Sequence, residues 1–289
     1  MAVKDTFFSK KTNININGEL IDLSEPCVMG IINVTPDSFY SGSRIADEGL
    51  IIKKVGQFLN EGAKFIDIGA YSSRPGSVEI DEKSEKERLR PVLIVIRKHF
   101  PNALLSIDTF RASIAEWAVR EFGVGIINDI SGGTLDARMF STIAKLQVPY
   151  ILMHMRGTPN TMQTLTEYKN VTKEVIGELS LRLYKLRELG VNDIIIDPGF
   201  GFAKTIEQNY ELLKFLDMFQ IFELPVMVGI SRKSMVYKLL NNSPEEALNA
   251  TTVLHTIALL KGADILRVHD VKEAVETIKI VASAKLNLI

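Results

Sequence analysis

The stretch IIIDPGFG, residues 194–201, indicates the fold of this 289-residue chain. Three consecutive isoleucines are typical of a strand that is buried on both faces, as in a parallel sheet. The strand ends at Asp197, because Pro198 cannot continue a hydrogen-bonded ladder and Gly199 and Gly201 permit a sharp turn. An acid at the carboxyl end of a parallel strand is where α/β enzymes place binding groups, although Asp197 taken alone could simply cap the turn.

The same pattern of an apolar strand followed by a helix occurs eight times along the chain. The predicted strands are residues 28–34, 65–71, 104–109, 125–131, 150–155, 193–200, 225–231 and 264–270. The predicted helices are residues 47–60, with Asp47 as N-cap, 81–99, 110–122, 136–146, 166–189, 206–219, 244–261 and 271–286. Eight alternations favour the α/β class and a single (β/α)8 TIM barrel. A doubly wound open sheet is the alternative, but the segment after the first strand lacks the glycine-rich phosphate turn of that fold.

A short N-terminal β-hairpin precedes the barrel. Residues 13–23 alternate apolar and polar side chains around Asn17-Gly18, which is a strong signal for a two-residue turn. We expect this hairpin to close the amino-terminal end of the barrel and to serve stability. The chain contains no linker or low-complexity tract, so we predict one domain over residues 1–289.

Composition excludes several classes of partner and of site. Hydrophobic residues make up 46% and charged residues 24% of the chain, and the net charge is -1, which favours neither nucleic acid nor a membrane surface as a partner. One cysteine, Cys27, excludes an internal disulfide and is predicted to be a buried structural thiol. The amino-terminal residues lack the apolar core of a signal peptide, and no stretch is long and apolar enough to span a membrane, so we predict a cytoplasmic protein.

Polar residues lie at or near the carboxyl ends of the predicted strands. Because parallel strands of a barrel end at one mouth, these side chains are predicted to form a ring that binds a ligand. A buried charge is costly unless it is paired, so a ring of such residues is better explained by a ligand than by chance. The ring comprises Asn33, Asp67, Asp108, Asn128, Asp129, His154, Asp197, Ser231, Arg232, Lys233, Arg267 and His269.

The ring contains groups suited to two different parts of a substrate. Asp108, Asn128 and Asp197 are acceptors that suit an amidine-like edge, such as that of a pterin or a purine. Lys233, Arg267 and His269 suit a phosphate or diphosphate, and Asn33 could help to coordinate a Mg²⁺ ion that phosphate oxygens bridge. The four histidines lack the spacing of a zinc site, and His154 and His255 are predicted to be packed structural residues. Two long loops, residues 35–47 and 71–83, follow the first two strands and are predicted to act as lids.

Eight stretches in this order resemble the dihydropteroate synthase family, the folate-biosynthesis enzymes that sulfonamides target. They are GIINVTPDSF, IDIGAYSSRPG, SIDTF, INDISGG, ILMHMRGTP, IDPGFGFAK, VGISRKS and LRVHDV, which together span most of the chain. The resemblance implies a (β/α)8 barrel. It also implies an enzyme that condenses 6-hydroxymethyl-7,8-dihydropterin diphosphate with 4-aminobenzoate and releases diphosphate, with Mg²⁺ as cofactor.

The resemblance also implies roles for individual residues. Asp108, Lys233 and Arg267 are expected to be catalytic, and Asn33 is expected to contact the metal. The expected substrate-binding residues are Asn128, Asp197, Met153, Phe202, Gly229, Phe39, Ser73, Arg74, Pro75, Ser234 and His269. The chain departs from the family's usual Gly-Glu at Ala70-Tyr71, which puts any role of position 71 in doubt.

The resemblance further implies a homodimer, and the apolar segment ATTVLHTIALL, residues 250–260, could supply the contact or could simply pack on the barrel. Two other functions remain open at this point. One is a pterin-dependent methyltransferase, which would need no diphosphate site. The other is a pterin-binding protein without turnover, which only the replacements at Ala70 and Tyr71 favour.

Overall fold

The computed structural model describes residues 10–34, 44–71 and 79–286, and it contains the predicted parallel barrel. Its eight parallel strands are hydrogen-bonded in the order β8-β7-β6-β5-β4-β3-β10-β9. The ring closes where Ile196 pairs with Val226, next to a hydrogen bond of 2.8 Å from the amide of Ile196 to the carbonyl of Pro225. The strands are β3 (Cys27–Asn33), β4 (Phe65–Gly69), β5 (Leu105–Asp108), β6 (Ile126–Asp129), β7 (Tyr150–Met153), β8 (Ile194–Asp197), β9 (Met227–Val228) and β10 (Ile265–Val268).

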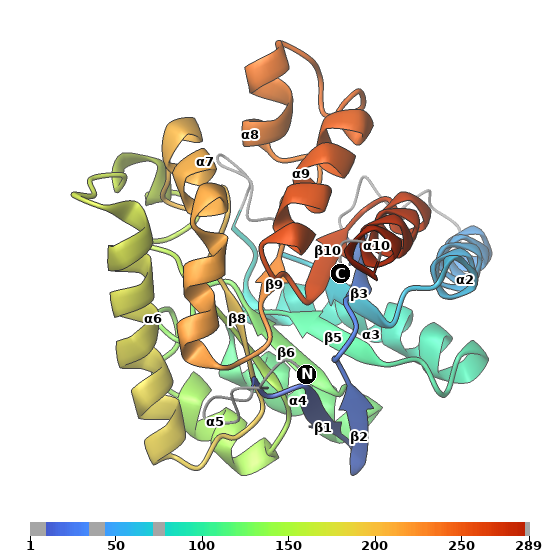
Figure 1. Ribbon diagram of the computed structural model, residues 1–289. Coiled ribbons are helices and arrows are strands. Elements are labelled where there is room, and N and C mark those ends of the chain that lie inside the picture. Colours follow the sequence, from blue (N-terminus) through green and yellow to red (C-terminus); the bar gives the residue numbers. More distant parts are fainter. Residues whose placement is uncertain (1–9, 35–43, 72–78, 287–289) are drawn as a thin grey trace, which may run out of the picture.

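Helices surround the strands on the outside of the barrel (Figure 1). The eight predicted helices are present, and a further short pair, α8 (Ser234–Tyr237) and the 3-10 helix η3 (Lys238–Leu240), was not predicted. Another 3-10 helix, η1 (Met162–Thr164), follows β7. The eight are α2 (Arg44–Glu61), α3 (Glu82–His99), α4 (Ala112–Phe122), α5 (Met139–Leu146), α6 (Val171–Glu188), α7 (Ile206–Lys214), α9 (Leu248–Leu260) and α10 (Val271–Leu286).

Some predicted helix ends were wrong. Helix α2 begins at Arg44, so Asp47 lies inside the helix and is not its N-cap. Helix α6 begins later than predicted, because the side chain of Asn170 accepts a hydrogen bond from the amide of Lys173 and caps the first turn. The predicted helix 206–219 is divided, since α7 ends at Lys214 and the 3-10 helix η2 (Leu216–Phe222) follows.

Alternation along each strand decides which side chains face the barrel interior. In β4, Ile66 and Ile68 belong to the large core between strands and helices, whereas Phe65 belongs to a separate core inside the barrel. Asp67 lies two residues beyond Phe65 and therefore faces the interior as well. The strand register aligns the interior residues of neighbouring strands, as in the pairing of Asp108 with Asn128. This register brings polar side chains together at the carboxyl ends.

The predicted hairpin is confirmed, and it closes the opposite end of the barrel. Strands β1 (Asn13–Ile16) and β2 (Glu19–Asp22) are antiparallel, and Asn17 and Gly18 both have positive φ in the turn. Ile14 and Ile16 are buried in the same interior core as Phe65. Figure 1 shows the hairpin at the lower end of the barrel, far from α8 at the upper end. The hairpin thus stabilises the end that carries no ring of polar residues.

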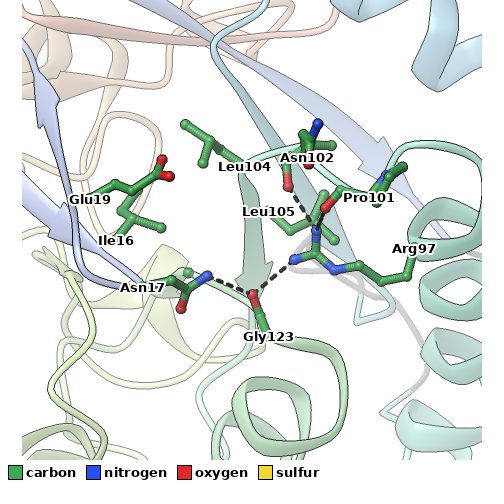
Figure 2. A pocket seen from close by; sticks show the side chains of 11 residues that line it. Ile16, Asn17, Glu19, Arg97, Pro101, Asn102, Leu104, Leu105 and Gly123 are labelled. Carbon is green, nitrogen blue, oxygen red and sulfur yellow. Dashed lines mark hydrogen bonds between the residues drawn. The ribbon is translucent and has the colours of Figure 1, made fainter.

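A cavity of about 230 Å³ lies beside this hairpin, and Figure 2 shows the residues that line it. Arg97 fills one side and donates to the carbonyls of Pro101 and Gly123 over 3.1 and 2.9 Å. The side chain of Asn17 also donates to the Gly123 carbonyl over 3.2 Å. These bonds attach the hairpin turn and α3 to the chain between α4 and β6, so the guanidinium serves structure here. Within the part of the chain that the structure describes, no helix has the length and apolar character to cross a membrane.

Candidate active site

Arg267 on β10 bonds two acids that belong to neighbouring strands. Its Nε donates to Asp67 Oδ2 and its Nη2 to Asp108 Oδ2, both over 2.6 Å. Asp67 is fully buried, whereas the side chains of Arg267 and Asp108 are 17% and 19% exposed. Burial alone would lower the pKa of Arg267, but Asp67 and Asp108 reverse this effect and raise it. The guanidinium therefore stays charged at the barrel mouth.

The electrostatic balance is less favourable for the Asp108 carboxylate, because Asp108 and Asp67 share the one cation of Arg267. Burial raises the pKa of the Asp108 carboxyl to about 7, with Arg267 opposing the shift and Asp67 adding to it. Gly69 lies directly beside it in register, and a Cβ at Gly69 would meet Asp108 Cβ at 3.2 Å. The glycine at position 69 thus leaves room for the carboxyl, which can change its protonation state near neutral pH.

Two buried oxygens of this group have no hydrogen-bond donor among the described residues. Asn128 donates from Nδ2 to Asp67 Oδ2 over 3.0 Å, but Asn128 Oδ1 and Asp67 Oδ1 accept no hydrogen bond. Buried acceptors without a donor are unfavourable in a native structure, so each such atom suggests a missing partner. A ligand edge that carries N–H groups would satisfy both oxygens.

Asp197 and Lys233 form a second pair of charges across the mouth. Asp197 Oδ1 accepts the amide of Gly199 over 2.8 Å, and Lys233 donates to the carbonyl of Phe200 over 2.5 Å. Burial lowers the pKa of Lys233 to about 8, and Asp197 opposes that shift. Burial raises the pKa of Asp197, with Lys233 opposing. The predicted turn is confirmed, since Gly199 and Gly201 have φ of 73° and 81°.

Apolar side chains form one wall beside these charges. Met153 and Phe202 are buried in a small cluster of their own, separate from the main core. The Lys233 ammonium lies 4.6 Å from the centre of the Phe202 ring, a favourable cation–π distance. Gly229 is buried, and a Cβ added there would come within 3.8 Å of Lys233 Nζ. An apolar wall beside paired charges suits a flat heteroaromatic ligand.

The remaining predicted residues lie around the rim. His269 Nδ1 is 3.3 Å from Ser231 Oγ on the loop after β9. Arg232 forms two hydrogen bonds of 2.7 and 2.8 Å with Asp270, so it serves structure although it belongs to the predicted ring. Ser234 is half-buried at the start of α8. Asn33 is exposed at the end of β3.

Four predicted binding residues lie outside the residues that the structure describes. They are Phe39, Ser73, Arg74 and Pro75, and both predicted lid loops include such positions. Among the residues it does describe, no group of three or more His, Cys, Asp or Glu side chains could hold a metal ion.

Cys27, Asp129 and the two internal histidines all lie in structural surroundings. Cys27 was predicted to be buried but is only half-buried, at the start of β3, and burial raises the pKa of its thiol to about 12, which disfavours the reactive thiolate. His154 and His255 are both buried, as expected. Asp129 accepts hydrogen bonds from Ser131 and from the Tyr150 hydroxyl, the latter over 2.7 Å, and shapes the turn after β6.

Sequence reasoning missed two features of the site. Asp67 was placed in the ring but was not assigned to substrate or catalysis, and only the strand register reveals its contact with Arg267. Tyr71, at the position where the chain departs from the family, packs edge-on against Phe110 with ring centres 5.0 Å apart. Arg111 lies 4.7 Å from the centre of the Phe110 ring, so an aromatic–cation stack occupies the position of the usual acid.

Comparisons with known proteins identify relatives of this chain. A family model described as "Pterin binding enzyme" matches residues 29–269. The dihydropteroate synthase of Escherichia coli is 40% identical over 279 residues, which cover 93% of this chain and 96% of that protein.

Solved structures give the same result. The dihydropteroate synthase of Yersinia pestis in complex with a sulfonamide drug is 37% identical, covering 94% of this chain and 99% of that one, with a TM-score of 0.87. The Xanthomonas albilineans enzyme with 4-aminobenzoic acid is 32% identical, covering 95% of this chain and 98% of that one, with a TM-score of 0.86. By sequence and by fold, this chain belongs to the dihydropteroate synthases, within the family of pterin-binding enzymes.

Proposed function

We propose that this enzyme joins 6-hydroxymethyl-7,8-dihydropterin diphosphate to 4-aminobenzoate, with the residue roles that follow. The observation that carries the proposal is the group of Asp67, Asp108 and Arg267, where two buried oxygens, of Asp67 and of Asn128, lack a donor among the described residues. A pterin presents N–H donors along one edge of a flat ring. Such a ring would satisfy the two oxygens and would fit against the apolar wall of Met153 and Phe202.

The pterin would be recognised by groups from five strands and two loops. Asn128 and Asp197 accept hydrogen bonds from its amino-pyrimidinone edge, and Lys233 donates to a ring acceptor from the opposite side. Arg267 can stack its planar guanidinium on the ring. Asp108, whose pKa is raised to about 7, contacts the ring nitrogens and stabilises positive charge that develops on the pterin.

The diphosphate would lie toward the rim at His269 and Asn33. Asn33 is exposed at the end of β3, and its side chain makes no hydrogen bond with the described residues. One neutral amide oxygen suits Mg²⁺, which takes few protein ligands when phosphate oxygens supply the others. A bound Mg²⁺ would neutralise part of the negative charge of the diphosphate. Asn33 is the residue that would hold the ion.

The 4-aminobenzoate would lie against Phe202, Lys233 and Ser234, with Phe39, Ser73, Arg74 and Pro75 contributing from the two loops. A relative solved with 4-aminobenzoic acid supports this choice of second substrate. The arylamine is neutral at pH 7, so it needs no strong base to become a nucleophile.

The chemical step follows from this arrangement of charges. The bond between the pterin methylene carbon and oxygen breaks first, and its electron pair leaves with diphosphate. The arylamine nitrogen then attacks the resulting cation, a C–N bond forms, and the surplus amine proton passes to solvent. The acids stabilise the cation, and Arg267 and His269 stabilise the leaving group.

Diphosphate release tests the proposal directly. The purified protein is given the pterin diphosphate, Mg²⁺ and 4-aminobenzoate, and each component is omitted in turn. Release that requires Mg²⁺, together with formation of dihydropteroate, is the expected result. Pterin binding without release would instead indicate a binding protein without turnover. Methyl transfer from a methylated pterin would indicate the methyltransferase.

A homodimer is the second part of the proposal. Helices α9 and α10 pack on each other and both carry exposed apolar side chains, and the ion pair between Lys261 and Asp217 joins the end of α9 to η2, which carries two more. Large exposed apolar patches on a protein surface mark interaction sites. The patch comprises Met218, Ile221, Val253, Ile257, Leu260 and Ile280.

The variant Leu260→Asp tests this interface, because it places a charge among these exposed apolar side chains. Leu181→Asp is the control, since Leu181 is also exposed, at 68% against 55% for Leu260, but lies on α6 and outside this set. Light scattering after size exclusion is expected to give a dimer for the wild type and the control, and a monomer for Leu260→Asp. A wild-type monomer would refute the interface. A single domain over residues 1–289 and a cytoplasmic location stay predictions.

A further inference from the structure

A row of ionisable groups that the reaction does not use lies behind the barrel mouth, between β7, β8 and α6. Lys204 is only 5% exposed and His154 is fully buried. The Lys204 ammonium lies 2.9 Å from the Gly199 carbonyl, 3.0 Å from the Phe202 carbonyl and 3.0 Å from His154 Nδ1. Burying a lysine costs free energy unless its ammonium is fully hydrogen-bonded, so these three contacts indicate that Lys204 has a specific role in the structure.

The geometry assigns the protons in this row. An ammonium group has three N–H donors and no acceptor, and Lys204 contacts three acceptors. His154 Nδ1 must then be the unprotonated nitrogen, so Nε2 carries the hydrogen and donates to Glu178 Oε2 over 3.1 Å. The reverse tautomer would direct an imidazole lone pair at a carboxylate. Burial lowers the pKa of His154 to about 3, in agreement with a neutral ring.

Glu178 is itself held in place by two arginines. Arg156 donates to Glu178 Oε1 from Nη2 over 2.6 Å and from Nε over 2.8 Å, and Arg182 lies 3.5 Å away. The Arg156 guanidinium also lies 3.9 Å from the centre of the Tyr168 ring. The Tyr168 hydroxyl in turn donates to the Ala203 carbonyl over 3.0 Å. Two separate connections thus run from α6 and its preceding loop to the turn after β8.

The turn that these contacts reach has an unusual backbone. Gly199, Gly201 and Ala203 all have positive φ, and Ala203, at 49°, is not a glycine. Such conformations cost free energy and persist only where surrounding contacts hold them. The same turn presents the Gly199 amide to Asp197 and the Phe200 carbonyl to Lys233. Its shape therefore determines how two substrate-binding side chains are oriented.

We propose that Lys204 is a positioning residue, which holds the turn after β8 in the shape that pterin binding requires. His154 and Glu178 orient its ammonium, and the carbonyls of Gly199 and Phe202 receive it. Lys204 touches no substrate in this arrangement. It acts through Asp197, Lys233 and the Phe202 ring, so the inference rests on the proposed pterin site.

The test compares Lys204→Met with the wild type and with Lys173→Met, a control on the exposed face of α6. Binding of 6-hydroxymethylpterin is measured by calorimetry at pH 6.5, because burial lowers the pKa of Lys204 to about 7, with Asp197 opposing. Displacing groups that orient a site typically costs about tenfold to a hundredfold, so the Kd of Lys204→Met is expected to rise within that range. The KM for the pterin diphosphate is expected to rise more than kcat falls.

Histidine-selective ¹⁵N NMR supplies a second measurement that a general loss of stability would not imitate. The wild type is expected to show His154 with Nε2 protonated and Nδ1 unprotonated, and Lys204→Met is expected to move the Nδ1 signal. If Lys204→Met does not fold, Glu178→Gln replaces it. Glu178 is partly exposed, and this change keeps the side-chain volume while removing the negative charge.

The outcomes separate this inference from the proposed function. A wild type that fails to bind the pterin would refute the proposed site itself. A wild type that binds the pterin, with Lys204→Met or Glu178→Gln binding it equally well, would overturn the role of Lys204 alone. A weaker pterin Kd in these variants, with Lys173→Met unchanged, supports the inference.

Discussion

Replacement of Asp108 by asparagine is predicted to stabilise the fold at neutral pH while it impairs turnover. The pKa of Asp108 rises from 3.8 to about 7, chiefly through burial. The folded protein therefore binds this proton more tightly than the unfolded chain does between those two pH values. The stabilisation of the fold that Asp108 gives when it is protonated is present in full below about pH 4, and it is lost as the pH rises through about 7.

The magnitude follows from the size of the shift. A rise of about three units corresponds to roughly 4 kcal/mol at 1.36 kcal/mol per unit. Water screens part of this cost, because the Asp108 side chain is 19% exposed. We therefore expect a penalty of about 2–4 kcal/mol in the wild type above pH 7. Asp108→Asn removes the titration, keeps an oxygen for Arg267, and leaves Asp67 as the neutralising charge.

Urea denaturation of both proteins at pH 4, 5, 6, 7 and 8, at one ionic strength, measures this effect. The difference in unfolding free energy between variant and wild type should grow with pH and level off above about pH 7. Subtracting the wild-type value from the variant value removes the pH dependence that the other buried acids contribute, because both proteins contain those acids. A difference that does not change with pH would refute the raised pKa. Near-normal turnover of Asp108→Asn would refute cation stabilisation by this residue.

Three further predictions follow from the site. Arg267→Met leaves the buried Asp67 without its cation, so the unfolding free energy is expected to fall by about 3–5 kcal/mol in urea denaturation, and an unchanged value would contradict the pairing. Lys233→Met removes a charged donor and is expected to weaken pterin binding about tenfold to a hundredfold by calorimetry, whereas a change confined to 4-aminobenzoate would contradict its assignment to the pterin. Gly199→Ala places a Cβ 1.9 Å from the His154 carbonyl oxygen at a φ of 73°, so the melting temperature is expected to drop by several degrees. Gly18→Ala is the control, because Gly18 also has a positive φ but a Cβ there would meet no neighbouring atom. An equal drop in the melting temperature of both variants would show that backbone strain alone explains the loss.

Local sequence patterns were sufficient to predict the barrel and most of its mouth. Runs such as IIID end at a polar residue, and parallel strands bring such residues to one end whatever the details of packing. The contact of Asp67 with Arg267 was beyond prediction because it depends on strand register and on closure of the ring. Asp67 also lies two residues before the end of its strand, where a buried acid has no local signal.

The errors have equally physical causes. Arg232 follows a strand in sequence, but its backbone turns through a φ of 55° and its guanidinium pairs with Asp270 instead of facing the ligand. Helix α8 has only four residues, too few to show a period of 3.6. Lys204 lies in a glycine-rich turn, its side-chain partner His154 follows β7, and His154 in turn contacts Glu178 on α6. No pattern within one segment could have revealed that connection.

The span of the Arg267 bonds along the chain has a consequence for how the protein is made. Arg267 lies 200 residues after Asp67 and 159 residues after Asp108. During synthesis the acids therefore leave the ribosome long before the cation that neutralises them. A nascent barrel without its last strand would have to bury both carboxylates uncompensated, which disfavours premature closure. Assembly of the barrel mouth and completion of the chain are thereby coupled, so a product truncated before β10 should be left open, inactive and accessible to proteases.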